Sequence, residues 1–300
     1  MAITNSPLRY PGGKSSITPF LKEVIRLNDL TGGVYIEPYA GGAGAALNLL
    51  FDGIVKRIVI NDFDPCVYSF WKAILHYTDD FIKRINSIQL NISEWHNQKN
   101  ILINSSQHTL FNVGFATFYL NRCNRSGILM AGPIGGLQQK GQYPISARFN
   151  KKALIDKISR IAQFKNNIDV YNLDALELIK YIVPSFKDNV LIYLDPPYYE
   201  KGSQLYLNAY THQNHASLAN LLINEQKNRA WVLTYDDTKE VRHLYHSDWV
   251  GTYNLNYFAH HAKKGNELVI APPQVILPAE VSIKYGLNQS SSSRHISTIG

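Results

Sequence analysis

The sequence predicts an α/β fold in which a wound sheet is interrupted by an inserted segment. Strand and helix signals alternate from Val34 to about Tyr77, falter, and resume at Ile168, as expected when helices join the strands of one sheet. A glycine loop follows a strand in the first part, and Asp195-Pro196-Pro197-Tyr198 follows a strand in the second. In open α/β sheets ligands bind at the carboxyl ends of the strands. Both motifs are therefore candidate site residues.

The first glycines, in Pro11-Gly12-Gly13-Lys14-Ser15-Ser16, match a phosphate-binding loop only in part. That pattern needs a glycine where Leu8 stands and a buried strand before it, and the chain provides neither. One interpretation is a turn that caps a helix over residues 16–27. We favour another interpretation, in which Tyr10 and Lys14 reach the candidate sites at the glycine loop and at Asp195-Pro196-Pro197-Tyr198.

A strand, a glycine turn and a helix follow one another over residues 33–50. Gly33 to Glu37 has the pattern of a strand, residues 38–44 are small and rich in glycine, and residues 45–50 begin a helix. Glycine allows the backbone to approach a ligand closely. The next strand, over 57–60, is followed by Asp62, where an acidic side chain suits a ribose diol. This arrangement favours a nucleoside site.

Residues 79–150 are predicted to be an insertion that selects the target. Its first part has apolar residues at helical spacing around Phe81 and Ile85, and an apolar helix is expected over 111–120. From Asn121 a glycine-rich loop with arginines and amides follows, which can donate to base edges in a major groove. The alternative is a mobile surface loop, but long irregular loops are uncommon unless they are functional.

The second part of the sheet is predicted to end in a hairpin. Strands are expected at 168–171, 191–194, 231–234 and 268–270, with helices at 151–164 and 175–182. Segments 249–258 and 267–271 are predicted to form the hairpin. The catalytic domain is expected to comprise residues 1–78 and 151–279, and the serine-rich residues 280–300 are expected to form a disordered tail.

Asp195-Pro196-Pro197-Tyr198 offers the groups needed to methylate the amino group of a nucleobase. The exocyclic nitrogen of adenine is a poor nucleophile because its lone pair is delocalised into the ring. A carboxylate and a fixed carbonyl that accept its two N–H bonds would free that lone pair for attack. Tyr198, with Tyr199 behind it, would give a flipped base a stacking face. The alternative is a strand that ends in a proline turn without catalytic function.

The order of these motifs resembles that of the Dam-type DNA adenine-N6 methyltransferases over about residues 8–272. In that family the donor loop comes first, the target-recognition region is inserted in the middle, and Asp-Pro-Pro-Tyr follows, which is called the alpha order. The resemblance implies a Rossmann-like S-adenosylmethionine-dependent methyltransferase sheet with an inserted, mainly helical DNA target-recognition region. It rests on residues 8–14, 37–45, 61–62, 118–122 and 195–198.

The resemblance also implies roles for individual residues. Asp195 and Pro196, with Pro197 in the same turn, would bind the target amine, and Tyr198 would stack on the flipped adenine. The residues expected around S-adenosylmethionine are Tyr10, Lys14, Glu37, Pro38, Tyr39, Gly41, Asp62, Asp174 and Asp195. The residues expected to contact double-stranded DNA are Asn121, Arg122, Arg125, Ser126, Met130, Gln138 and Arg148. Members of the family that recognise the sequence GATC carry an arginine near the position of Met130. The resemblance therefore does not imply that this chain recognises GATC.

Some polar residues near these motifs have more than one interpretation. Asp174 would bond the adenine amine of the donor or cap the next helix, and the two roles are compatible. Arg148 would touch phosphate or pair with a surface acid. Asp236-Asp237 is expected to cap the helix that follows it. His260-His261 lacks metal-ligand spacing, and no metal site is predicted.

The whole-chain properties agree with a DNA-modifying enzyme. Three hundred residues with 45% hydrophobic content support a sizeable core, and a formal charge of +7 favours an anionic partner. Two distant cysteines, Cys66 and Cys123, fit a reducing compartment, the cytoplasm. The sequence shows no secretion signal and no apolar run long enough to span a membrane.

The sequence therefore predicts an enzyme that transfers a methyl group from S-adenosylmethionine to N6 of adenine in a specific double-stranded DNA sequence, with base flipping. The alternatives are amino methylation of cytosine N4, RNA or a protein amide, and a DNA-binding regulator that has lost catalysis. Intact Asp195, Tyr198, Gly41 and Asp62 argue against the last of these. The sequence does not specify the recognition sequence, the oligomeric state or the protein partners. It also leaves open a role in restriction-modification, self-marking or regulation.

Overall fold

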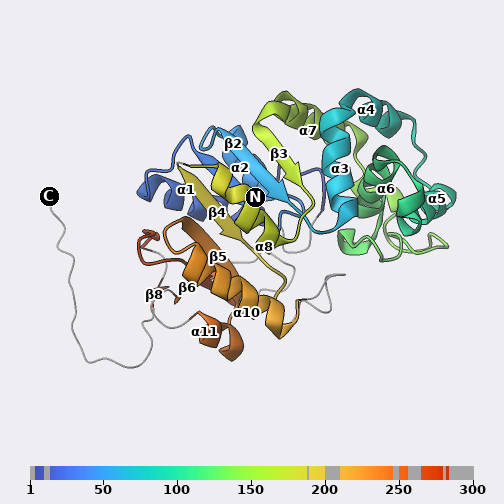
Figure 1. Ribbon diagram of the computed structural model, residues 1–300. Coiled ribbons are helices and arrows are strands. Elements are labelled where there is room, and N and C mark those ends of the chain that lie inside the picture. Colours follow the sequence, from blue (N-terminus) through green and yellow to red (C-terminus); the bar gives the residue numbers. More distant parts are fainter. Residues whose placement is uncertain are drawn as a thin grey trace.

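The structure, a computed structural model, contains one sheet with helices on both faces (Figure 1). It describes residues 4–9, 14–187, 189–199, 210–245, 250–255, 265–279 and 282–283. The strands are β1 (Val34–Glu37), β2 (Arg57–Asn61), β3 (Ile168–Tyr171), β4 (Val190–Leu194), β5 (Ala230–Asp236), β6 (Val250–Leu255), β7 (Gly265–Ile270) and β8 (Ser282–Ile283). The helices are α1 (Thr18–Leu27), α2 (Gly44–Phe51), α3 (Pro65–His76), α4 (Thr78–Ser87), α5 (Ile92–Ile103), α6 (Leu110–Cys123), α7 (Lys151–Gln163), α8 (Ala175–Glu177), α10 (His212–Asn220) and α11 (Lys239–Leu244).

The described strands form an eight-stranded sheet in the order β3-β2-β1-β4-β5-β7-β6-β8. From β3 to β5 neighbouring strands are parallel, whereas β7 is antiparallel to both β5 and β6. The first five strands follow the order of a Rossmann sheet, which reverses between β1 and β4. The predicted α/β fold and the predicted terminal hairpin are thus confirmed.

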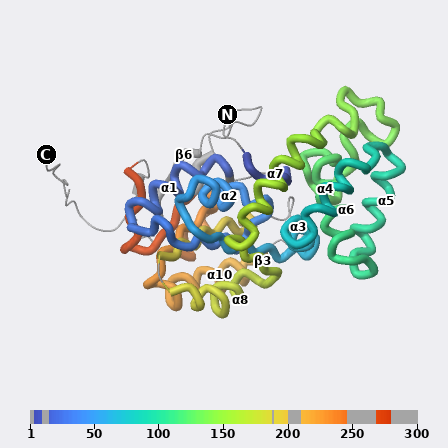
Figure 2. The backbone as a smooth tube through the Cα atoms, turned by 90° about the horizontal axis from the view of Figure 1, so that it is seen from above, coloured from blue at the N-terminus to red at the C-terminus, as the bar shows by residue number. Residues whose placement is uncertain are grey.

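Alternate residues of each strand enter two different hydrophobic cores. Tyr35 of β1 and Tyr193 of β4 belong to the core under α1 and α2, and Ile192 belongs to the core under α8 and α10. Figure 2 shows these two pairs of helices on opposite faces of the sheet. Because side chains alternate along a strand, Glu37 and Thr234 are directed to the same face as Tyr193.

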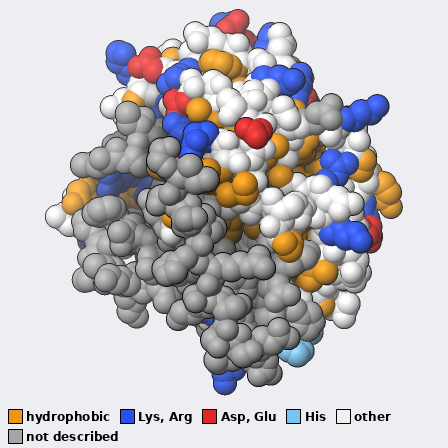
Figure 3. All heavy atoms as spheres, turned by 90° about the vertical axis from the view of Figure 1, so that its left-hand side faces the viewer, with side chains coloured by type: hydrophobic (Ala, Val, Ile, Leu, Met, Phe, Trp, Pro, Cys, Tyr) orange, Lys and Arg blue, Asp and Glu red, His pale blue; other side chains and the backbone are white. Residues whose placement is uncertain are grey.

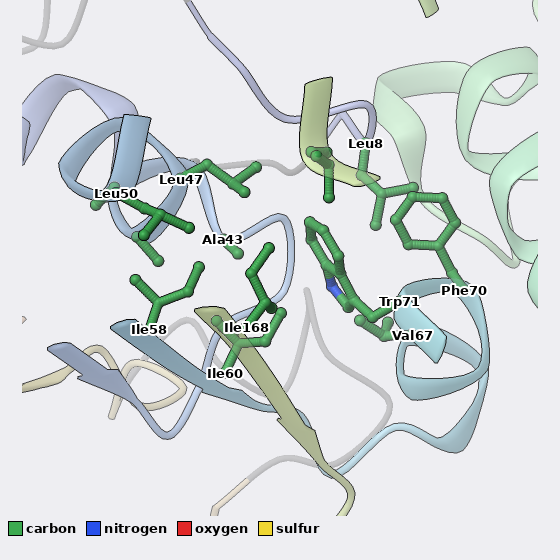
Figure 4. Close-up of a cluster of buried hydrophobic side chains, with 14 of the residues drawn as sticks. Leu8, Ala43, Leu47, Leu50, Ile58, Ile60, Val67, Phe70, Trp71 and Ile168 are labelled. Atoms are coloured by element: carbon green, nitrogen blue, oxygen red, sulfur yellow. The ribbon is translucent and has the colours of Figure 1, made fainter. Parts of the chain in front are cut away.

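The inserted helices share the first of these cores. In Figure 1, α4, α5 and α6 lie at one end of the sheet beside α3. Phe70 of α3 stacks on Phe118 of α6 with ring centroids 5.9 Å apart, and Phe81 of α4 packs against both. Figure 4 shows Phe70 and Trp71 of α3 beside Leu8, and the same cluster extends to Ile60 of β2. The insertion is therefore continuous with the core of the sheet.

Several helix starts follow from local capping, as the sequence suggests. Asp174 accepts a hydrogen bond from the Leu176 amide at 2.8 Å, so its predicted capping role is confirmed. The prediction that Asp236-Asp237 caps α11 is wrong. Thr238 is the cap, because its hydroxyl accepts the Val241 amide. The Asp237 carboxylate instead forms a two-bond pair with Arg242.

At the carboxyl-terminal end, two residues of the expected tail take part in the sheet. Ser282–Ile283 pair with β6, and the other residues of 280–300 lie outside the described part. Between the two segments of the predicted hairpin, residues 256–264 lie outside the described part, and Gly265 and Asn266 belong to β7. In the described residues no helix has the length and apolarity needed to cross a membrane, and no cluster of three potential metal ligands occurs.

We predict that Phe118→Ala will destabilise the sheet and the insertion together. Removing this fully buried ring leaves a cavity in the shared core and should cost about 3–5 kcal/mol of unfolding free energy. Urea unfolding followed by tryptophan fluorescence and by circular dichroism should give one shared, shifted transition. Tyr181→Ala, at a ring that is 74% exposed, is the control and should change stability by less than about 0.5 kcal/mol. Two separate transitions in the Phe118 variant would contradict a shared core.

Candidate functional site

Four carboxylates meet the same edge of the sheet. Glu37 ends β1, Asp62 follows β2, Asp195 follows β4 and Asp236 ends β5. Because these strands are parallel, their carboxyl ends lie side by side at the reversal point of strand order. Glu37 is only 2% exposed. The edge therefore combines negative charge with a site where the fold accommodates ligands.

The glycine loop between β1 and α2 is held in an unusual backbone conformation. Gly41 and Ala43 both have a φ of 46°, in the left-handed region. The Gly41 amide donates to Asp62 Oδ2 at 2.9 Å, and the Gly41 carbonyl accepts from Trp71 Nε1 at 3.0 Å. A Cβ on Gly44 would lie 2.3 Å from Ser15 Oγ. The loop is thus fixed from three sides.

Asn61, the last residue of β2, connects the loops that follow the two neighbouring strands, β1 and β3. Its side-chain amide donates to the Pro38 carbonyl at 2.9 Å and to the Leu173 carbonyl at 3.0 Å. Its Oδ1 accepts the Leu173 amide at 2.9 Å. The carbonyl of Pro38, a predicted cofactor residue, is therefore used to shape the loop. Sequence analysis missed this role of Asn61, although a buried amide at a strand end was a usable signal.

Burial strongly perturbs the carboxyl of Asp62. Burial raises its pKa to about 7, more than the amides of Asp64 and Gly41 lower it. The next residue, Phe63, has a side chain that is 57% exposed. An acidic group and an exposed aromatic ring therefore stand together after β2. Sequence analysis missed Phe63, because nothing in the sequence shows that its ring is exposed.

The Asp195-Pro196-Pro197-Tyr198 turn is held by β5. Asp195 Oδ1 accepts a hydrogen bond from Thr234 Oγ1 at 3.0 Å. At the other end of the turn, the amide of Tyr199 donates to Asp236 Oδ1 at 2.9 Å. Asp195 and Tyr198 are half-buried and Pro196 is buried. Thr234 and Asp236 were not predicted as site residues.

An aromatic cluster lies behind the turn. His215 packs against Tyr199 with ring centroids 4.8 Å apart and shares a 2.6 Å hydrogen bond between its Nδ1 and the hydroxyl of Tyr235. Burial lowers the pKa of His215 to about 4, which keeps the ring neutral near pH 7. Tyr39, a predicted cofactor residue, bonds the hydroxyl of Tyr210 at 2.8 Å. Sequence analysis missed His215, which shows no motif signal.

Buried amides organise the insertion loop. Asn121 accepts the Arg9 amide at 2.7 Å and donates to the carbonyls of Arg9 and Gly127. Asn124 accepts Trp95 Nε1 at 2.6 Å and donates to two loop carbonyls. Gln139 makes similar bonds further along the loop. Side-chain hydrogen bonds therefore hold together the insertion loop, for which the sequence predicts no regular secondary structure.

Four cations gather where the amino-terminal segment meets the insertion. Three of them donate to a backbone carbonyl: Arg9 to that of Asn124, Arg122 to that of Arg148 and Lys157 to that of Ser6. Burial, together with Arg9 and Arg148, lowers the pKa of Arg122 to about 10. Among the described ion pairs none joins these four groups to a carboxylate. We call Arg9, Arg122, Arg148 and Lys157 the basic cluster.

The other predicted DNA contacts lie on the surface of the loop. Arg125, Ser126, Met130 and Gln138 are exposed. Tyr10, expected near the cofactor, lies outside the described residues, and Lys14 is described only by its backbone. The structure therefore brings Glu37, Gly41 and Asp62 to one edge with Asp195 and forms a separate polar surface on the insertion.

A family model described as D12 class N6 adenine-specific DNA methyltransferase matches residues 10–263. This range includes the glycine loop, the insertion and the Asp-Pro-Pro-Tyr turn. No curated protein matches the chain.

The raised pKa of Asp62 predicts a distinct pH dependence of stability. Between about pH 4, where the unfolded carboxyl ionises, and about pH 7, the folded protein keeps a proton that the unfolded chain has lost. The contribution of Asp62 therefore makes the folded state less stable as pH rises through this window. Unfolding free energies measured across it should decline for the wild type relative to Asp62→Asn. Parallel curves for the two proteins would show that the pKa of Asp62 is not raised.

Proposed function

Because this chain belongs to the D12 class N6 adenine-specific DNA methyltransferase family, a family of enzymes, we propose that it uses S-adenosylmethionine to methylate N6 of adenine in a specific double-stranded DNA sequence. The target base would be flipped out of the duplex. One observation carries the proposal. The Asp195 carboxyl, held by β5, stands at the same sheet edge as the glycine loop and Asp62.

The donor site would lie at the ends of β1 and β2. When bound there, S-adenosylmethionine supplies a methyl group on a positively charged sulfonium. Asp62 suits the ribose hydroxyls, Phe63 suits stacking on the adenine ring, and the fixed loop at Gly41 allows close backbone approach. Glu37 adds a buried acidic group to the same edge, which would favour a cationic ligand when it is ionised. The polar groups present therefore fit this donor.

The target amine would be bound by the Asp-Pro-Pro-Tyr turn. The Asp195 carboxylate accepts one N–H of the amine, and the carbonyl of Pro196 accepts the other. These two acceptors draw the nitrogen towards tetrahedral geometry and concentrate its lone pair towards the methyl group. Tyr198 would stack on the base after flipping. Tyr199 behind it is fixed by Asp236 and His215, which keeps the turn rigid.

The basic cluster and the insertion loop would bind DNA. The cations of Arg9, Arg122 and Lys157 are oriented by carbonyls, which fix these side chains without neutralising them, so their charge is available to phosphates. We propose that Arg122 and Arg148 contact phosphate, and that exposed Arg125, Ser126, Met130 and Gln138 face base edges. Asn121 would act by holding Arg9 and the loop.

The face opposite the insertion is formed only in part by described residues (Figure 3). Figure 3 shows the left-hand side of Figure 1, where hydrophobic, basic and acidic side chains are interspersed over the described surface. Such a mixed surface is typical of solvated protein exteriors. We assign DNA binding to the end of the sheet that carries the insertion, because the basic cluster lies there.

The proposed function predicts that Asp195→Ala abolishes methyl transfer while donor affinity changes only a few-fold. Loss of a charged acceptor at the reacting nitrogen should cost about 3 kcal/mol or more in the transition state. Transfer of labelled methyl groups to unmethylated duplex DNA, followed by nucleoside separation, measures both rate and product. Asp156→Ala, at an exposed aspartate paired with Lys152, is the control. Near-normal transfer by the Asp195 variant would refute the catalytic assignment, and N4-methylcytosine as product would refute the target.

The two arginines of the insertion should behave differently. Arg122→Ala should weaken binding to every DNA sequence alike and reduce the salt slope by about one, as expected for a phosphate contact. Arg125→Ala should cost about 1–3 kcal/mol on the preferred site only and broaden the methylated motif. Salt-titrated binding and methylation mapping check the pair. If both variants keep the wild-type methylated motif and the wild-type affinity for DNA, these arginines do not determine sequence specificity.

A further inference from the structure

At the edge of this sheet, three aspartate carboxyls are held in place by backbone amides of their own loops. Asp62, Asp64 and Asp174 each accept a hydrogen bond from the amide two residues further along the chain, at 2.9, 2.8 and 2.8 Å. Such bonds fix the side chain locally and need no other element. Asp195 cannot form one, because the residue two positions on is Pro197, which has no N–H.

The missing local donor is replaced by a hydroxyl from the next strand. Thr234 of β5 donates to Asp195 Oδ1 at 3.0 Å, and the hydroxyl of Tyr193 lies 2.9 Å from Thr234 Oγ1. A threonine hydroxyl has one hydrogen, and an ionised carboxylate only accepts. The hydrogen of Thr234 therefore goes to Asp195, and Tyr193 must donate to Thr234.

This chain of hydroxyls is rigid. Tyr193 and Thr234 are fully buried, and the ring of Tyr193 is stacked on that of Tyr35 with centroids 6.4 Å apart. Successive hydrogen bonds in a buried chain polarise and strengthen one another. The same strand holds the far end of the turn, since Asp236 accepts the Tyr199 amide. Between the hydrogen bonds of Asp195 and Tyr199, the two prolines have no backbone N–H to donate.

We propose that Thr234, oriented by Tyr193, is a positioning residue for Asp195. Its hydroxyl fixes the rotation of the carboxyl in the direction of the target amine, a function that the prolines deny to the local backbone. That the partner is an amine rests on the proposed function. The hydroxyl chain itself rests only on the contacts of β4 and β5.

Kinetics of matched variants test the proposal. Thr234→Val keeps the shape of the side chain but removes the hydroxyl, and should lower kcat about 10- to 100-fold, the scale of one lost hydrogen bond to a charged group. Thr234→Ser restores the hydroxyl and should return kcat to within about 3-fold of wild type, on the same scale. Tyr193→Phe should lower kcat less than Thr234→Val. The dissociation constant for S-adenosylmethionine should stay within about 2-fold in all three variants, because the donor groups are untouched.

A control separates positioning from stability. Thr117→Val removes an equally buried hydroxyl, bonded at 2.8 Å to the Val113 carbonyl within α6, and should leave kcat unchanged. Thermal unfolding of each variant shows whether it is folded at the assay temperature. A folded Thr234→Val enzyme with wild-type kcat, or a Ser variant as slow as the Val variant, would overturn the proposal while leaving the proposed function intact.

Crystal structures of the free wild type and of Thr234→Val provide a readout that needs no activity. The carboxyl of Asp195 should occupy one orientation in the wild type, and should rotate or split between orientations in the variant. If the wild-type protein fails to methylate DNA, the proposed function fails, yet this comparison still decides whether Thr234 positions Asp195. An unchanged carboxyl in the variant would overturn the inference.

Discussion

Parallel pairing of β1 with β2 and β4 determines where every proposed catalytic group lies. It brings the ends of these strands to one edge, but the strands alone do not fix the loops that follow them. Side chains at the strand ends do so: Asn61 bonds the loops after β1 and β3, Asp62 holds the Gly41 amide, and Thr234 holds Asp195. The site is thus built from contacts between neighbouring loops.

This construction concentrates polar groups in a buried place, which has a cost in stability. Several carboxyls meet at one edge, and burial raises the pKa of Asp62 to about 7. The left-handed backbone at Ala43 adds strain, because a side chain disfavours that conformation. The continuous core, from Ile60 of the sheet to Phe118 of the insertion, offsets these costs. It also joins the proposed DNA-binding and catalytic regions into one structure.

Local patterns made much of this fold predictable. Apolar runs identified the strands, and the Asp-Pro-Pro-Tyr run identified the turn after β4. The contacts that shape the site were not predictable, because they join residues far apart in sequence. Thr234 and Asp195 are separated by 39 positions, and Asn61 and Leu173 by 112. The same limitation explains the error at Asp236: a local cap was expected, but its carboxylate bonds the amide of a turn on the neighbouring strand.

We propose that this sheet edge methylates adenine in DNA. Single-molecule sequencing of DNA from methylation-free cells that express the chain tests it most directly, because it detects the modified base and its sequence context together. We expect N6-methyladenine at one defined sequence, and none in cells that express Asp195→Ala. Unmodified adenine in cells that contain folded wild-type protein, or modification of cytosine instead, would contradict it.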